Sequence, residues 1–170
     1  MHIRKSLPGD IKAITEIYRE ARRFMRSTGN LTQWTGSYPG EESAYKDMLL
    51  GRGYVCEDDY AVIAAFCFYE GVDPSYARIH GGCWAGDSRY GVIHSVAVLK
   101  PGERTGGFCV DYCLDNCREL RADTHRSNLP MRRLLTKKGF VYRGMIYLPD
   151  GGERMAYSRK GSLAQTCGLM

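Results

Sequence analysis

The sequence contains no long hydrophobic run, and this argues against a membrane-spanning helix. No apolar stretch among its 170 residues approaches the ~20 residues that a helix needs to cross a bilayer. The opening segment MHIRKSLPGD also lacks the apolar core of a secretory signal peptide. We therefore expect a cytoplasmic protein that does not contact a membrane.

The sequence shows no sign of a disulfide framework. Its seven cysteines are odd in number and no export signal accompanies them, so we expect reduced thiols. Cys109, Cys113 and Cys117 recur every fourth residue, but no Cys/His pair at zinc spacing lies near them. This spacing predicts a buried helix face of small side chains and no metal site.

The sequence also lacks a long basic run, although its net charge is +5. Lysines and arginines are scattered, and part of the excess lies near a candidate anion site, at Lys100, Arg104, Arg132 and Arg133. We therefore favour binding of an anionic cofactor over binding of nucleic acid. The nucleic-acid alternative predicts salt-sensitive retention on DNA or RNA.

Neither internal repeats nor a long linker divide the chain. A hydrophobic content of 44% and a charged content of 25% are typical of a globular protein, and the length suits one domain. We expect a single domain over residues 1–160, followed by a flexible tail over residues 161–170.

Two familiar phosphate-binding motifs are missing from the glycine-bearing segment after residue 98. No lysine follows Gly106 or Gly107 as the nucleoside-triphosphate loop requires, and the dinucleotide fingerprint G-x-G-x-x-G is absent. What the sequence has is an apolar run at Val92–Val98, a Pro/Gly turn, the segment ERTGG at residues 103–107, and a helical pattern from near Phe108. A strand, a glycine loop and a helix N-terminus in succession form an anion site. This order predicts a ligand that carries phosphate.

Hydrophobic periodicity and turn residues predict the remaining elements. Together they predict an α+β fold around one mixed sheet. Helices are expected from an Asp10 cap to about Ser27 and over residues 41–50, 108–120 and 129–138, the last after Asn128 as N-cap; strands are expected over residues 2–7, 54–57, 61–69, 93–99, 120–124, 142–148 and 154–157.

The segment RTGGF at residues 104–108 resembles the [QR]-x-x-G-x-[GA] loop of the GNAT superfamily of acyl-CoA-dependent N-acyltransferases. With Gly106 at the first glycine position, Phe108 stands where a second small residue is usual, which is a departure from the motif. The later order of strand, Asn128, helix and Gly139-Phe140 is similar to that of superfamily members too. The resemblance covers roughly residues 2–160.

The resemblance implies a three-layer α/β/α sandwich with a mostly antiparallel sheet and two central parallel strands, Ile93–Leu99 and Arg121–Thr124, that splay apart. It implies transfer of an acetyl group from acetyl-CoA to the primary amine of a small molecule, amino acid or peptide within a ternary complex, with no metal. A homodimer through the C-terminal strands is common in such families. The residues implied to contact acetyl-CoA are Val96, Ala97, Val98, Arg104, Thr105, Gly106, Gly107, Phe108, Asn128 and Met131. The alternative is a catalytically inactive CoA-binding sensor or protein-interaction module.

Two histidines and one tyrosine are candidates for proton transfer. By strand alternation His94 shares a face with Val92 and Val96, and it is either a general base or substrate contact, or a histidine satisfied within the sheet. His125 follows the second splayed strand and serves as a base or caps the loop through its ring. Many superfamily members have a tyrosine that protonates the leaving thiolate at the position where this chain has Leu135. Tyr147 is the substitute donor, unless the thiolate leaves unassisted.

The loop over residues 28–40 is implied by the resemblance to border the acceptor site. It contains Gln33, Trp34 and Tyr38, which we identify as candidate substrate contacts. The Trp34 ring would pack against an amine or aromatic substrate. The alternative is a tryptophan that covers the edge of the core.

Overall fold

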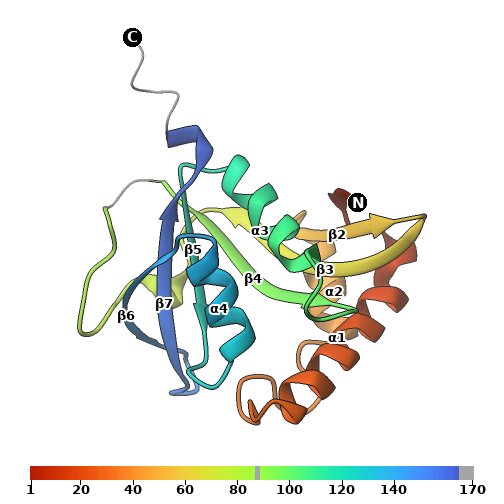
Figure 1. Ribbon diagram of the computed structural model, residues 1–170, viewed down its shortest axis with the longest axis horizontal. Helices are drawn as coiled ribbons and strands as arrows, with labels where there is room; N and C mark the ends of the chain where they lie inside the picture. The colour runs from red at the N-terminus through yellow and green to blue at the C-terminus, as the bar shows by residue number, and fades with distance from the viewer. Residues whose placement is uncertain (87–88, 165–170) are drawn as a thin grey trace. The chain divides into compact units, whose positions relative to one another are not determined.

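The computed structural model describes residues 1–86 and 89–164 (Figure 1). Its strands are β1 (His2–Lys5), β2 (Gly53–Asp58), β3 (Ala61–Glu70), β4 (Gly91–Val98), β5 (Glu119–Thr124), β6 (Val141–Tyr147) and β7 (Glu153–Lys160). Its α-helices are α1 (Ile11–Ser27), α2 (Glu41–Leu49), α3 (Thr105–Asp115) and α4 (Leu129–Lys137), and short 3-10 turns lie at Pro8–Asp10, Pro74–Tyr76 and Ser162–Ala164.

The strands form one seven-stranded sheet in the order β1-β2-β3-β4-β5-β7-β6. β4 and β5 are parallel, with Gly91–Ile93 in register with Leu120–Ala122, and both strands continue beyond these residues. The β1/β2, β2/β3, β5/β7 and β6/β7 pairs are antiparallel. The predicted α+β class, with a mostly antiparallel sheet and a central parallel pair, is confirmed.

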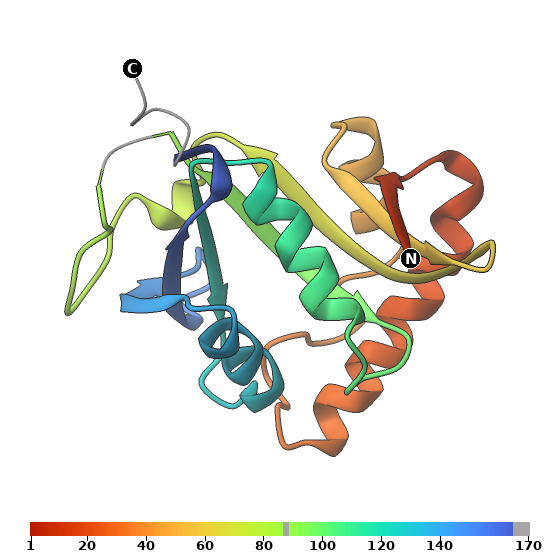
Figure 2. The same cartoon turned by 45° about the horizontal axis from the view of Figure 1, so that its top comes forward.

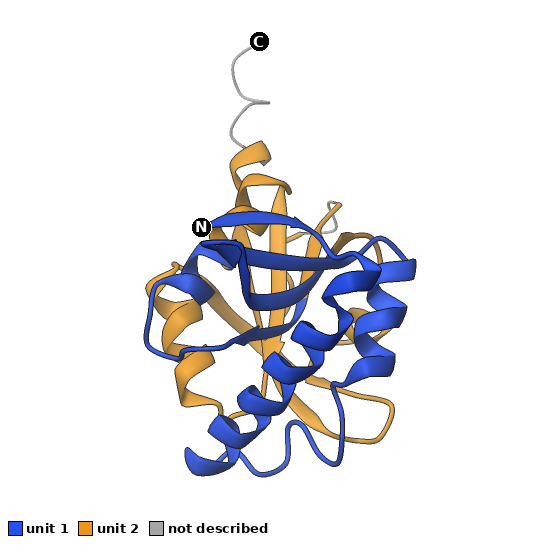
Figure 3. Ribbon diagram, turned by 90° about the vertical axis from the view of Figure 1, so that its right-hand side faces the viewer, with its two compact units in different colours: residues 1–68, 94–109 blue, residues 69–93, 110–170 orange. Residues whose placement is uncertain are grey.

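The chain divides into two compact units (Figure 3). The first holds residues 1–68 and 94–109, and the second holds residues 69–93 and the chain from residue 110 onward. The boundary passes through β4 and α3, so both units draw on the central elements. A single domain over residues 1–160 stays a prediction.

The core of the first unit lies where α1 and α2 cover the sheet. Ile11, Ile14, Ile17, Tyr18 and Ala21 recur at helical spacing on α1, and all are buried in one cluster with strand residues such as Val55 and Ala65. Burial of each large aliphatic side chain contributes roughly 1.5–3 kcal/mol to folding. The apolar face predicted for α1 is therefore confirmed.

The cap predicted at Asp10 serves the turn before α1. The Asp10 carboxylate accepts a hydrogen bond from the Leu7 N–H at 2.7 Å and pairs with the Arg4 guanidinium at 2.6 Å. No N–H of α1 donates to it. Asp10 therefore stabilises the connection between β1 and α1, in which the short 3-10 turn at Pro8–Asp10 lies.

α3 starts earlier and ends earlier than the sequence pattern predicts. The expected range was 108–120, whereas the helix spans Thr105–Asp115 and the Phe108 N–H donates to the Arg104 carbonyl at 3.0 Å. Gly106 and Gly107 thus lie in its first turn, where their low helix propensity conceals the start. Figure 2 shows the chain passing from the end of β4 through a loop into α3.

β2 ends one residue later than the strand expected over residues 54–57, so its connection to β3 is shorter. β2 includes Asp58, and the connecting residues are Asp59 and Tyr60, with φ angles of 47° and 63°. A two-residue hairpin needs positive φ at its central positions because only such turns match the twist of the strands. An Asp-Tyr pair gives no strong signal for this turn.

The core of the second unit gathers around Tyr76, Val92, Ile146 and Ala156. At the far end of this unit, Gly161 is buried and its N–H donates to the Arg118 carbonyl at 2.8 Å. The predicted tail therefore begins with a packed residue, and residues 165–170 lie outside the described part of the chain. None of the helices in the described ranges is long and apolar enough to cross a membrane.

Candidate active site

β4 contains an irregularity beside His94. Ser95 has a φ of 52°, which is rare for a residue other than glycine and breaks the strand alternation. The Gly71 N–H donates to the Tyr90 carbonyl at 3.2 Å, and the Leu99 N–H donates to the Ile63 carbonyl at 2.8 Å. Between these two bonds the register of β4 against β3 slips by one residue, so Ser95 is the extra residue of a β-bulge.

The bulge changes which side chains share a face with His94. After the bulge, Ala97 lies opposite Ala65, and both belong to the core cluster beneath α1 and α2. Before the bulge, the register places His94 opposite Cys67, which lies on the same face of β3 as Ala65. His94 therefore shares its face with Ala97, and the expected alternation with Val96 fails at Ser95.

The last residues of β4 direct backbone groups away from β3. The Leu99 N–H points to β3, and N–H groups alternate along a strand, so those of Val96 and Val98 point the other way. Val96 and Val98 are half-buried, and Ala97 is buried. This orientation leaves two N–H groups able to pair with an extended ligand as an added strand would.

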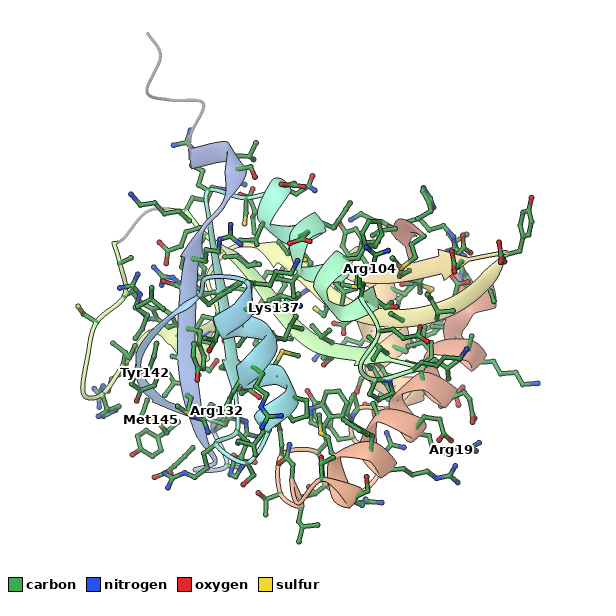
Figure 4. All side chains as sticks on the ribbon, viewed as in Figure 1. Arg19, Arg104, Arg132, Lys137, Tyr142 and Met145 are labelled. Carbon is green, nitrogen blue, oxygen red and sulfur yellow. The ribbon has the colours of Figure 1, made fainter. Side chains whose placement is uncertain are left out.

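The first turn of α3 supplies further donors. The N–H groups of Thr105, Gly106 and Gly107 precede the first intrahelical bond, so the helix itself offers them no acceptor. The positive end of the helix dipole lies at the same place. Arg104 is exposed at this end of α3 (Figure 4), and Phe108 is half-buried. An anion site here stays a prediction, and these are the groups that would form it.

In the second unit, Asn128 caps α4. Its Oδ1 accepts the Met131 N–H at 3.2 Å, which confirms the predicted N-cap. Asn128 is buried and Met131 is half-buried. Arg132 and Lys137 extend from the same helix (Figure 4). The cofactor contacts of Asn128 and Met131 stay predictions.

His125 is held by its own loop. Its Nδ1 accepts the Ser127 N–H at 3.2 Å, the loop-capping contact that was one of its two expected roles. Burial lowers the pKa of His125, and the nearby Arg154 and Arg126 lower it further. The neutral ring with Nδ1 as acceptor carries its proton on Nε2, which makes it a donor. A donor role fits His125 better than the role of a base.

Tyr147 and Leu135 bear on the missing general acid. Tyr147 is exposed at the end of β6, with its ring edge-on to His80 at a centroid distance of 5.1 Å. Leu135 is 1% exposed within the core, so α4 carries no acid at this position. The donor role of Tyr147 stays a prediction.

The candidate substrate residues separate into buried and exposed groups. Trp34 is buried in the core cluster, edge-on to Tyr18 at 6.1 Å, which matches the alternative of a tryptophan at the core edge. Gln33 accepts a hydrogen bond from Asn30 at 2.9 Å, and Tyr38 is 57% exposed. Of the three, Tyr38 remains the most accessible for a substrate contact.

The three cysteines of α3 and its C-terminal end are fully buried. The Cys117 thiol donates to the Cys113 carbonyl at 3.1 Å, and burial raises the pKa of Cys117 to about 12. In residues 1–86 and 89–164 no group of three or more His, Cys, Asp or Glu side chains is placed to hold a metal ion. The predicted buried face of small side chains is confirmed.

Sequence reasoning missed a carboxylate in the first unit. Asp47, near the end of α2, is half-buried, and burial raises its pKa, while the Cys67 thiol, Arg52 and His94 act in the opposite direction. No local pattern could have indicated this grouping, because the three elements that carry these side chains are far apart in the sequence.

A bulged central strand leading into a glycine-bearing helix, within a sheet that holds one parallel pair, defines a protein of the GNAT acetyltransferase fold. Comparison with solved structures supports this class. A GNAT-family acetyltransferase from Streptococcus agalactiae superposes with a TM-score of 0.84 at 28% identity, over 95% of both chains. No protein-family model and no curated protein matches the sequence.

More distant structures share the fold. An N-acetyltransferase from Staphylococcus aureus has a TM-score of 0.62 at 18% identity, over 94% of this chain and 97% of that one. A ribosomal-protein-alanine N-acetyltransferase from Brucella melitensis has a TM-score of 0.63 at 16% identity, over 94% and 99%. The chain therefore has the fold of GNAT acetyltransferases, and this fold suggests acyl transfer.

Proposed function

We propose that this protein is an acetyl-CoA-dependent N-acetyltransferase that acts on the primary amine of a small molecule, amino acid or peptide. The observation that carries the proposal is the first turn of α3, one short loop after β4, where the N–H groups of Thr105, Gly106 and Gly107 precede the first intrahelical bond. A cytoplasmic location and a homodimer belong to the same proposal; the first rests on the sequence features given above, and the second rests on the resemblance alone.

The residues present fit acetyl-CoA. Two glycines in the first turn of an eleven-residue helix let the backbone approach a pyrophosphate, and Arg104 adds a positive charge. The N–H groups of Val96 and Val98 would bind the pantetheine arm, and the Val98 N–H would face the developing oxyanion. When bound, acetyl-CoA supplies the activated acyl group. In the second unit, Asn128 and Met131 are the proposed cofactor contacts.

The loop motif has a second register, in which the departure at Phe108 is replaced by a smaller one, a cysteine in place of glycine or alanine. Counted from Arg104 as the first motif residue, Gly107 takes the glycine position and Cys109 takes the final small position. Cys109 is fully buried, as is expected of a small side chain on the side of a helix that faces the protein core. This register makes Phe108 an ordinary variable position.

His94 is the proposed base. The ammonium of the acceptor gives one proton to the His94 ring, and the neutral amine then attacks the thioester carbonyl carbon. The C–S bond breaks, and Tyr147 or water donates a proton to the leaving thiolate. The attacking nitrogen loses one of its two protons, which restores that donor, and the amide keeps the other. The products are the amide and free thiol, and the proton held on His94 passes to solvent. Tyr38 and Gln33 would border the acceptor.

Thermal unfolding with and without ligand tests the cofactor. We expect a saturable rise in melting temperature with acetyl-CoA and with free CoA, but none with ATP, because a ligand that binds only the native state stabilises it by about 2.7 kcal/mol at one hundred times Kd. Gly106→Leu should abolish the shift while the fold persists. Gly9→Leu is the matched control, since a Cβ at Gly9 has no heavy atom within 4 Å.

Turnover is measured by thiol release across a panel of amines. Release with at least one amine supports the transferase. CoA binding with no release from any amine would instead support the inactive CoA-binding sensor. An undiminished ligand shift in Gly106→Leu would show that the pyrophosphate lies elsewhere.

A further inference from the structure

Three strands of the first unit align small or polar residues on one face. Gly53 of β2 pairs with Cys67 of β3, and the register before the Ser95 bulge places His94 of β4 opposite Cys67. Directly opposite residues on neighbouring strands point to the same face. Val55, Ala65 and Ala97 lie on that face too, and they pack in the cluster formed with α1 and α2.

The end of α2 lies against the first residue of this row. The Arg52 N–H donates to the Asp47 carbonyl at 2.9 Å, which folds the chain back at the end of the helix. A Cβ built on Gly53 would stand 3.2 Å from the Met48 nitrogen and 3.3 Å from the Asp47 carbonyl carbon. Since Gly53 has no side chain, the α2 backbone sits directly on the strand and brings Asp47 over the row.

We propose that Asp47 is a positioning residue for His94, holding its ring in orientation and stabilising its protonated form. This inference rests on the proposed function, because it concerns the base of that reaction. Asp47 touches no substrate in this scheme and acts through the histidine, with the Cys67 thiol beside both.

The electrostatics of the cluster agree with its geometry. Burial raises the pKa of Asp47, while a hydrogen bond from the Cys67 thiol and the charges of Arg52, His94 and Lys46 lower it. On the α1 side, burial raises the pKa of Tyr18, and the Asp47 charge adds to that rise. Tyr18 therefore stays a neutral phenol. Among the groups named here that face Asp47, His94 is the one whose residue type has an ordinary pKa near neutrality.

An ionised Asp47 makes His94 a stronger base. A carboxylate within about 4–6 Å favours the imidazolium and typically raises a histidine pKa by about one unit or more. A fixed ring orientation also keeps one nitrogen aimed at the incoming ammonium, which is the geometric part of general base catalysis.

The test replaces Asp47 by asparagine, which keeps the shape and removes the charge. The matched control is Glu42→Gln, the same chemical change at an exposed position in the first turn of α2. The His94 ring protons are titrated by NMR in each protein, and kcat/KM is measured against pH. We expect Asp47→Asn to lower the His94 pKa by about one unit, with at least a tenfold loss of kcat and little change in CoA binding. Glu42→Gln should change none of these.

The NMR titration needs no turnover, so failure of this inference and failure of the proposed function are distinguishable. An unchanged His94 pKa in Asp47→Asn overturns the inference even if the enzyme is active. If Asp47→Asn lowers the His94 pKa but the wild-type protein acetylates no amine, the pairing is supported and the proposed transferase activity is refuted. If Asp47→Asn does not fold, the wild-type titration decides, and a His94 pKa at or below the ordinary ~6.5 refutes the pairing.

Discussion

Replacing Arg121 by methionine should cost more stability than any other single change considered for the second unit. The Arg121 Nε lies 2.8 Å from the Glu119 carboxylate, and a terminal nitrogen donates to the Gly86 carbonyl at 2.6 Å. The guanidinium also stands 3.8 Å from the Tyr90 ring centre and 4.3 Å from that of Trp84. Both charged side chains are almost fully buried, at 5% and 7% exposure.

The magnitude follows from what the substitution leaves behind. Methionine fills part of the volume but strands the Glu119 carboxylate in the interior, and breaking a buried pair from one side costs about 3–5 kcal/mol. The lost cation–π contacts and the Gly86 bond act on the same group, so their energies are not simply added. Against a total stability of about 5–15 kcal/mol, this loss is large.

Urea denaturation measures the free energy of unfolding for each variant. Arg121→Met is compared with Arg89→Met, since Arg89 is 74% exposed and its ion pair with Glu70 is solvated. We expect about 3–5 kcal/mol for the first and under about 1 kcal/mol for the second. The double variant Arg121→Met with Glu119→Gln should regain part of the loss, because it removes the stranded charge. A loss below about 1 kcal/mol for Arg121→Met, or a double variant less stable than the single one, would refute the reasoning.

Two further predictions concern the second unit. Because the pKa of His125 is lowered from its ordinary value of ~6.5, the unfolded chain takes up a proton first as pH falls; stability should drop below about pH 6.5, and this pH dependence should weaken in His125→Asn. A His125 NMR titration at or above the ordinary value would contradict this. Asn128→Ala should cost about 1 kcal/mol through loss of the Met131 cap and should also raise KM for acetyl-CoA, whereas Asn128→Ser should restore the stability but not the KM. Equal KM values in all three proteins would remove Asn128 from the cofactor site.

Local patterns in the sequence are enough to predict much of the fold. The α1 face, the hairpin of β6 and β7, the Asn128 cap and the buried cysteines all follow from spacing and from residue type. The start of α3 is missed because Gly106 and Gly107 are poor helix formers in isolation. In the protein they lie in the first turn of α3, where a low helix propensity does not prevent the helix from forming.

The candidate site is less predictable, and His94 shows why. Alternation along Val92–Val98 predicts that His94 shares a face with Val96, which is wrong. Ser95 takes a left-handed conformation, and nothing in the sequence indicates this for a serine. Trp34 shows the same limit in the other direction. Its place in a polar loop suggests a substrate contact, whereas its ring packs against Tyr18 within the core.

The sequence by itself determined the order of strands and helices along the chain and the prediction of an anion site after β4, since both depend on residues adjacent in the chain. Only the tertiary structure decided the surroundings of His94. The bulge at Ser95 sets its face, and the close packing of α2 on Gly53 brings Asp47 to the same face from a distant part of the chain. Such groupings depend on register and on contact between elements, and neither quantity is encoded in the spacing of residues within one segment.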